Sequence, residues 1–186
     1  MASQISKDQL LDEVYELIRE KGYHAVTPSS LGEKLGESPE DIQQIMDSFE
    51  NLDEAILKKM LQRFVDFSKN LNPVTQAPHL GASLCFLARD QPNLFRAFDQ
   101  LRFNPESLLT VFEEMGKMIE AHPYYSELEP DEKRELRSVR FMAAMGLGKF
   151  LLGDVRSRRS DEDIVQEITG LSDLLKAGII ARRDQD

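Results

Sequence analysis

The sequence predicts an all-α protein, and three observations support this. Apolar residues recur at spacings of three and four from one end of the chain to the other, which is the period of an amphipathic helix. No segment alternates between apolar and polar residues over more than a few positions, so no β-sheet is expected. Glycine and Ser-Pro, Thr-Pro or Asn-Pro pairs stand where helices end and begin. We therefore expect about nine helices arranged in two lobes.

The first helix is expected over residues 6–21. Its apolar stripe consists of Leu10, Leu11, Val14, Leu17 and Ile18, and Gly22 follows directly as a C-terminal cap. A second, short helix begins at Thr27-Pro28 and ends before Gly36, because proline is favoured at the first helical position.

A third helix begins at Ser38-Pro39, and its buried stripe is expected to be Ile42, Ile45, Met46 and Phe49. Asn51 with Glu54 resembles a capping box for a fourth helix that runs to about residue 69. The following segment, 70–79, contains two prolines and is interpreted as a linker between the lobes.

Five more helices are expected after the linker. Asn104-Pro105 begins one of them, Gly153 and Gly178 are expected to end two of them, and Ser160 with Asp163 resembles a capping box. Their predicted ranges are 80–90, 92–101, 105–121, 131–152 and 161–177. We divide the chain into a helix-turn-helix domain at 1–56 and a helical regulatory and dimerisation domain at 57–186, connected by the helix at 52–69.

Composition excludes several classes of protein. Hydrophobic residues make up 41% and charged residues 30% of the chain, which is ordinary for a globular protein. We find neither a signal peptide nor an apolar run long enough to cross a membrane, and we expect a cytoplasmic protein. The single cysteine, Cys85, lies in an apolar run and is expected to be an inert buried thiol.

No catalytic or cofactor chemistry is evident in the sequence. The three histidines, His24, His79 and His122, lie far apart without metal-ligand spacing. No phosphate-binding glycine loop or nucleophile motif is present. We expect no enzyme, no metal and no cofactor.

The N-terminal residues resemble the TetR/AcrR family of transcriptional regulators. Residues 18–27, IREKGYHAVT, resemble the family's "F-x-E-K-G-Y-x-A-T-T", and residues 31–38, LGEKLGES, resemble "I-A-x-x-A-G-V-S". Residues 49–56, FENLDEAI, resemble "F-x-S-K-E-E-L-L", and residues 90–96, DQPNLFR, resemble a turn of the regulatory domains. Keeping Phe49 in register requires about three extra residues in the third helix, whereas an ungapped alignment places Met46 there. We prefer the first alignment because Asn51 then caps the next helix.

The resemblance implies a ligand-responsive regulator, a repressor, that binds DNA as a homodimer. The candidate DNA-contacting residues lie in and around the second and third helices. They are Thr27, Ser29, Lys34, Ser38, Gln43 and Gln44. Glutamine can pair with adenine in the major groove.

The charge of this region opposes DNA binding. Residues 1–56 contain thirteen Asp and Glu against four Lys and Arg, which gives −9 of the chain's net −10. The third helix itself carries Glu40, Asp41 and Asp47 and no base. Because affinity for DNA comes largely from Lys and Arg that displace counterions, a protein that has lost DNA binding remains the alternative. It would act as a protein partner or coregulator, or would bind a small molecule or lipid.

The second lobe is rich in phenylalanine and methionine. The candidate residues of a pocket for an apolar or aromatic effector are Phe64, Phe67, Phe86, Phe95, Phe98, Phe103, Phe112, Met115 and Met118. An ordinary helical core explains the same spacing. The candidate polar anchors are Arg89, Arg96, Gln100 and Arg102.

The last two helices are apolar on several faces, which favours a surface that binds a second copy of the chain. The candidate residues of this homodimer interface are Phe141, Met145, Phe150, Ile164, Ile168, Leu171 and Leu175. The alternative is that these helices close their own lobe. Arg156, Arg158 and Arg159 form a basic loop, interpreted as a solvated loop or as a site for phosphate or an acidic partner.

Overall fold

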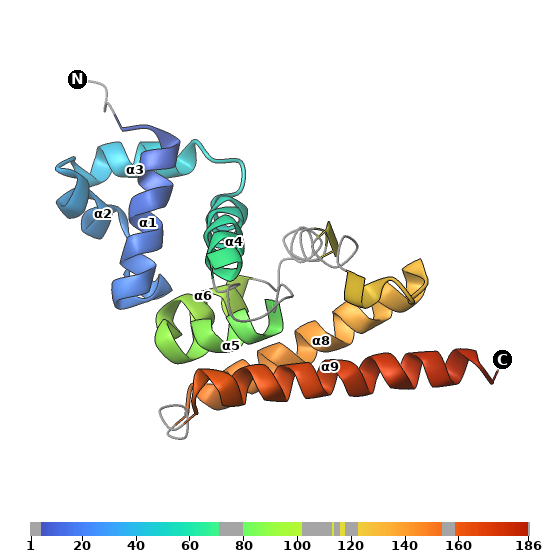
Figure 1. The fold of residues 1–186 in the computed structure, drawn as a ribbon. Helices are drawn as coiled ribbons and strands as arrows, with labels where there is room; N and C mark the ends of the chain where they lie inside the picture. Colours follow the sequence, from blue (N-terminus) through green and yellow to red (C-terminus); the bar gives the residue numbers. More distant parts are fainter. Residues whose placement is uncertain are drawn as a thin grey trace. The chain divides into compact units, whose positions relative to one another are not determined.

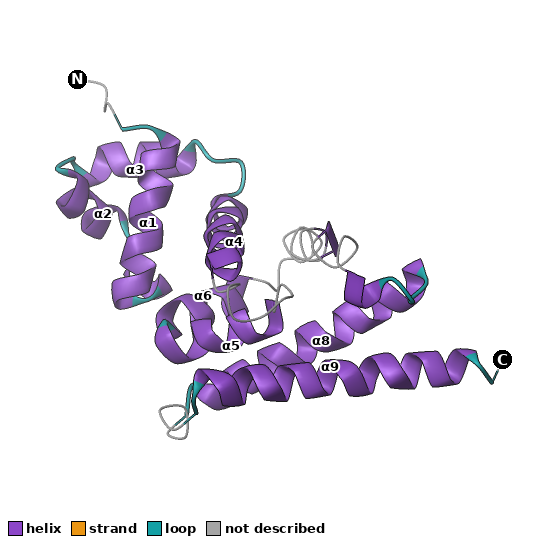
Figure 2. Cartoon of the chain, in the orientation of Figure 1, coloured by secondary structure: helices purple, strands orange, loops and turns teal. Residues whose placement is uncertain are grey.

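The computed structural model describes residues 5–70, 80–101, 113, 116–117, 123–153 and 159–185 of the 186-residue chain. Every regular element in these ranges is a helix, as Figure 2 shows, so the predicted all-α class is confirmed. Eight α-helices and two short 3₁₀ helices are described. The helix expected at 105–121 falls almost entirely outside these residues.

The described chain separates into two units by the density of its internal contacts. The first contains residues 5–63 and 91–101, and the second contains residues 64–90 and the described residues from 113 onward. The predicted domain boundary at residue 56 stays a prediction.

The first unit is built on α1 (Lys7–Lys21), whose predicted apolar stripe is buried along its whole length. Ser6 and Gln9 form a capping box at its start, and Gly22 ends it with a positive φ of 92°. Helix α6 (Pro92–Leu101) packs against α1 and against the 3₁₀ helix η1 (Tyr23–Ala25). Asn93 Nδ2 donates to the carbonyl of Arg19 at 3.3 Å. Helix α2 packs against α1, and α3 packs against α2 (Figure 1).

Helix α4 (Leu52–Asn70) begins as expected from its cap. The side-chain oxygen of Asn51 accepts a hydrogen bond from the backbone N–H of Glu54 at 3.1 Å. The Tyr23 hydroxyl donates to Asp53, which links η1 to the start of α4. Phe49 is only half-buried, and Lys7 Nζ lies 4.6 Å from the centre of its ring.

The second unit is formed by α5 (Leu80–Asp90), the 3₁₀ helix η2 (Pro123–Tyr125), α8 (Pro130–Leu151) and α9 (Asp161–Arg183), with the last residues of α4. Helix α5 packs against both α8 and α9, which lie side by side and run in opposite directions (Figure 1). The close approach of α5 to α9 requires a small residue at position 81, because a Cβ on Gly81 would lie 3.0 Å from Ile168 Cγ2.

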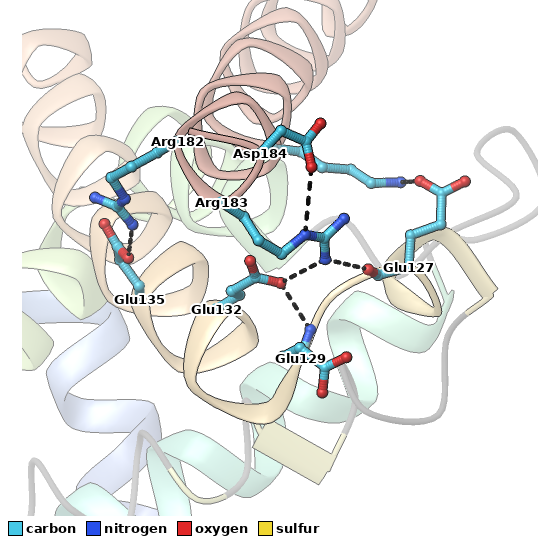
Figure 3. Close-up of polar contacts among 8 residues, drawn as sticks. Glu127, Glu129, Glu132, Glu135, Arg182, Arg183 and Asp184 are labelled. Carbon is cyan, nitrogen blue, oxygen red and sulfur yellow. Dashed lines mark hydrogen bonds and ion pairs between the residues drawn. The ribbon is translucent and has the colours of Figure 1, made fainter. Parts of the chain in front are cut away.

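The end of α9 is held against the start of α8 by charged side chains (Figure 3). Arg182 pairs with Glu135 at 2.5 Å, and Arg183 pairs with Glu132 at 3.3 Å. Arg183 also donates to the carbonyl of Glu127 at 3.2 Å.

The expectation that Gly178 ends the last helix is wrong, because α9 continues to Arg183. A helical glycine costs only about 1 kcal/mol relative to alanine. Beyond Gly178, Ile179 is buried against Tyr125, Leu128 and Leu136, and the two arginines of the last turn are ion-paired. Burial of an isoleucine side chain contributes about 1.5–3 kcal/mol, which outweighs the glycine penalty.

Candidate nucleic-acid interface

The candidate interface is the pair of helices α2 (Pro28–Leu35) and α3 (Pro39–Asp47), joined by a three-residue turn. Gly36 adopts the left-handed conformation, with φ 71° and ψ 28°, and the N–H of Glu37 then donates to the carbonyl of Gly32 at 3.0 Å. A Cβ on Gly32 would lie 2.7 Å from the Glu37 carbonyl oxygen. The two glycines therefore allow the chain to reverse tightly between the helices, as a helix-turn-helix requires.

Both helices are capped at their N-termini by candidate DNA-contacting residues. Thr27 Oγ1 accepts from the N–H of Ser30 at 3.2 Å, and Ser38 Oγ accepts from the N–H of Asp41 at 3.1 Å. The Ser38 hydroxyl also donates to the Asp41 carboxylate at 2.7 Å. Ser29 is exposed in the first turn of α2. Thr27 and Ser38 therefore stabilise the helix N-termini as caps, whether or not they contact DNA.

The outward face of α3 is acidic and amide-bearing. Ile42 is buried beneath it, while Glu40, Gln43, Gln44 and Asp47 are exposed. Gln43 Nε2 donates to the Asp47 carboxylate at 2.7 Å, so its amide is already partly engaged. Gln44 has no such partner in the described residues and is the freer of the two candidates for contacting a base edge.

Lys34 is the only base among the DNA-contacting candidates, and two glutamates of α1 hold it. Its Nζ lies 3.1 Å from Glu13 and 3.0 Å from Glu20. The hydrogen bonds that Lys34 donates to Glu20 and, with a smaller effect, to Glu13 raise its pKa. A phosphate would have to compete with both carboxylates for this ammonium group, so the structure reduces its capacity to bind DNA.

Two of the other three bases in residues 1–56 are similarly occupied. Arg19 pairs with Glu16 at 2.5 Å, and Lys7 donates to the carbonyl of Ser48 at 2.5 Å. Lys21 is exposed at the end of α1. The sequence count of thirteen acids against four bases therefore understates the shortage of cations that are free to meet a phosphate.

The phenylalanines predicted to line one pocket are divided between the two units. Phe95 and Phe98 are buried on α6 in the first unit, whereas Phe86 is buried on α5 in the second. Phe64 and Phe67 are half-buried on α4. The remaining candidates, Phe103, Phe112, Met115 and Met118, lie outside the described residues.

The candidate polar anchors are likewise divided between the two units. Arg89 pairs with Asp90 and with Asp161, both at 2.6 Å, and lies over the ring of Phe86. Arg96 and Gln100 are exposed on α6, and Arg102 is outside the described residues. Of the basic loop, Arg159 pairs with Glu167, and Arg156 and Arg158 are outside the described residues.

The residues predicted for the dimer interface differ in how far they are buried. Phe141, Met145, Ile164 and Ile168 are buried in the second unit's own packing, and Leu171 and Leu175 are half-buried. Phe150 is 53% exposed. Two further apolar residues of these helices, Met142 at 62% and Leu174 at 74% exposure, lie on the outer surface of α8 and α9. Their helical spacing alone could not have separated outer from inner faces, because both faces are apolar.

Sequence reasoning also missed three bases on α8. Lys133, Arg137 and Arg140 follow one another at spacings of four and three, so they lie on one face of the helix. This is the face that continues into the buried residues Ala144, Gly148 and Leu151. The spacing was visible in the sequence, but a solvent-exposed stripe was the ordinary interpretation.

Cys85 is buried as expected, and its Sγ lies 3.9 Å from the carbonyl oxygen of Ala144. Burial raises the pKa of this thiol to about 12, so it stays protonated and unreactive at neutral pH. In the described part of the chain, no group of three or more His, Cys, Asp or Glu residues is placed to hold a metal ion. None of the described helices combines the length and the apolar character needed to cross a membrane.

Comparison with protein-family models, with curated proteins and with solved structures finds no match for this chain.

Proposed function

We propose that the chain is a TetR-like, ligand-responsive transcriptional repressor that binds DNA as a homodimer through α2 and α3. The observation that carries the proposal is the tight turn between these helices, built on Gly32 and on the left-handed Gly36. The turn leaves the N-terminal half of α3 exposed, and in helix-turn-helix proteins this part of the second helix enters the major groove.

Amides, rather than bases, would make the sequence-specific contacts. Gln43 and Gln44 are exposed one turn into α3, where each amide can pair with an adenine edge. Because Lys34 is held by two glutamates, the helix-turn-helix of each protomer would neutralise few phosphates. Each phosphate contact contributes about −0.9 to the slope of log K against log salt, so the expected slope is shallow.

The test is a selection of DNA fragments by the purified full chain at about 50 mM salt, where non-specific binding is strongest. We expect enrichment of a sequence with two related half-sites about one helical turn apart. A Gln43→Ala/Gln44→Ala variant should lose this enrichment, whereas Glu33→Ala, an exposed change on α2, should keep it. Equal recovery of all fragments by the native chain would contradict the proposal.

The homodimer belongs to the same proposal. Met142, Phe150 and Leu174 expose apolar side chains on α8 and α9, and burial of such residues against a second copy would remove them from water. A symmetric dimer is the commonest oligomer, and it would bring two copies of the α2–α3 helix pair into one complex.

The ion pairs of the first unit favour a second candidate function, in which its acidic surface binds a basic surface of a protein partner. Lys34 and Arg19 each hold a carboxylate within the unit, yet Glu40 on α3 and Glu50 after it remain exposed. A surplus of unpaired carboxylates attracts a cationic partner and repels DNA.

The two candidates predict opposite effects of charge removal. A Glu40→Gln/Glu50→Gln variant should bind DNA more tightly if α3 reads DNA, because repulsion of phosphates falls. The same variant should lose partner binding if the acidic surface is a docking site, with Glu162→Gln on α9 as the matched exposed control. Cross-linking in extracts of the source cells, followed by identification of the captured protein and a binding assay with it, measures the second effect.

A further inference from the structure

Helix α8 carries a stripe of three bases that form no ion pair among the described residues. Lys133, Arg137 and Arg140 occur at positions i, i+4 and i+7, and each is only partly exposed. The same face carries Ala144 and Leu151 further along, and both are fully buried. The three bases thus stand on the inward face of the helix rather than on its solvent face.

Two of the neighbouring carboxylates at the start of α8 are committed to other cations, as Figure 3 shows. Glu132 pairs with Arg183, and Glu135 pairs with Arg182. Of the remaining nearby acids, Asp131 pairs with Arg134 at 2.6 Å and Glu127 pairs with Lys176 at 3.0 Å.

The acid of α9 that attracts Arg140 is also hydrogen-bonded to another side chain. Asp173 accepts a hydrogen bond from the Tyr124 hydroxyl. Burial lowers the pKa of Arg140 and outweighs the opposing effects of Tyr124 and Asp173. Among the described residues, Arg140 makes its close contact with an aromatic face, since its guanidinium lies 5.6 Å from the centre of the Tyr125 ring.

Arg137 has an incompletely satisfied guanidinium. Its Nε is buried and has no hydrogen-bond partner in the described part of the chain. The group lies over the backbone of Gly116, where a Cβ would overlap Nη1, so a glycine is needed for it to occupy this position. Partly buried cations that repel one another and lack a partner are costly, and a bound anion would relieve that cost.

We propose that Lys133, Arg137 and Arg140 form a binding site for a small organic anion with a carboxylate or phosphate group. Two arginines three residues apart can each present a planar fork of donors, which suits both groups. The site deepens the proposed function, since it would make the effector of the second unit an anion rather than a neutral apolar molecule.

The experiment measures the melting temperature of the full chain with inorganic phosphate, benzoate or octanoate, in a buffer of constant ionic strength. Benzamide and octanamide serve as neutral analogues. A saturable rise of about 3 °C or more with an anion, and none with the amides, is expected, because a ligand that binds only the folded chain stabilises it. A response to phosphate alone identifies a phosphate-bearing ligand, and a response to the carboxylates alone identifies an organic acid; both support the site.

The matched variants are Arg137→Gln and Arg134→Gln, one turn apart on the same helix. Arg137→Gln should weaken anion binding about tenfold or more, while Arg134→Gln, whose side chain is 65% exposed and paired with Asp131, should stay within about twofold of the native chain. Without anion, Arg137→Gln should melt no lower than the native chain, because it removes repulsion from its neighbours. Arg140→Lys keeps the charge without the fork and should bind at an intermediate level.

No saturable response of the native chain to any of the three anions would overturn the proposal. So would equal losses in Arg137→Gln and Arg134→Gln, or an anion-free Arg137→Gln chain that melts well below the native one. DNA binding enters none of these measurements, so a failure of the anion site and a failure of the proposed regulator are distinguishable.

Discussion

The conformation of Gly36 gives the sharpest stability prediction for the turn between α2 and α3. Its φ of 71° and ψ of 28° lie in the left-handed region, and a Cβ built there meets no atom within 4 Å. Replacement by alanine therefore tests backbone strain without any steric contribution from neighbours. The left-handed conformation costs an ordinary L-residue about 1–2 kcal/mol.

The alanine also restricts the unfolded chain, which offsets about 0.4–1 kcal/mol of that cost. The net expectation for Gly36→Ala is a loss of about 1 kcal/mol, or roughly a fivefold change in the folding equilibrium. For a chain of this size, the melting temperature should fall by about 2–4 °C. Urea unfolding followed by helical circular dichroism measures the same change as a lower midpoint at unchanged slope.

Two companion variants decide whether the reasoning holds. Gly36→Asn should recover about half or more of the loss, because asparagine adopts the left-handed conformation more readily than alanine does. Glu33→Ala, an exposed change on α2, should stay within about 0.5 kcal/mol of the native chain. A Gly36→Ala chain as stable as the native one, or a Glu33→Ala chain equally destabilised, would refute the assignment of strain to this residue.

Three further predictions concern other parts of the chain. The Cys85 thiol, whose pKa burial raises to about 12, should not react with a disulfide reagent at pH 8 until urea unfolds the chain; rapid reaction without urea would contradict its burial. Hydrogen bonds from Lys59 and Arg63 lower the pKa of Asp12, so its contribution to stability is present above the unfolded pKa of about 3.9 and is lost as the pH falls through the lower folded value. The urea midpoint of an Asp12→Asn chain should therefore depend less on pH below about pH 4. An unchanged dependence would exclude a contribution from the ion pairs of Asp12 with Lys59 and Arg63. Leu174→Glu should shift the mass measured by light scattering from two chains to one with helical content retained, and a native chain that is already monomeric would exclude the dimer.

The helices themselves were largely predictable, because their signals are local. Thr27-Pro28 and Ser38-Pro39 begin helices where expected, and Asn51 caps the next one, since a cap depends only on residues a turn away. Gly178 shows the limit of local signals. Its helix continues because Ile179 packs against Tyr125, a residue more than 50 positions earlier, and no window of sequence contains that contact.

The candidate sites were less predictable for the same physical reason. Phe86 and Phe95, both expected in the pocket, are only nine residues apart yet belong to different units, because the division falls between α5 and α6; the pocket stays a prediction. Spacing establishes which residues share a helix face but not what that face meets. The apolar faces of α8 and α9 illustrate this, since Met145 is buried while Met142, three residues earlier, is 62% exposed.

The arrangement of charges in the structure differs from what their count in the sequence suggests, and this difference has the largest consequence for binding. The sequence locates nearly all the net negative charge in residues 1–56 and leaves the rest of the chain almost neutral. In the structure, the acidic N-terminal unit has few free bases, because carboxylates hold Lys34 and Arg19. Residues 57–186 carry a net charge of only −1, yet α8 there has the opposite imbalance, because α9 supplies Arg182 and Arg183 to its acids. Ion pairs between helices thus redistribute the available charge, and the three bases of α8 that we propose bind an anion lie where the net charge gives no sign of them.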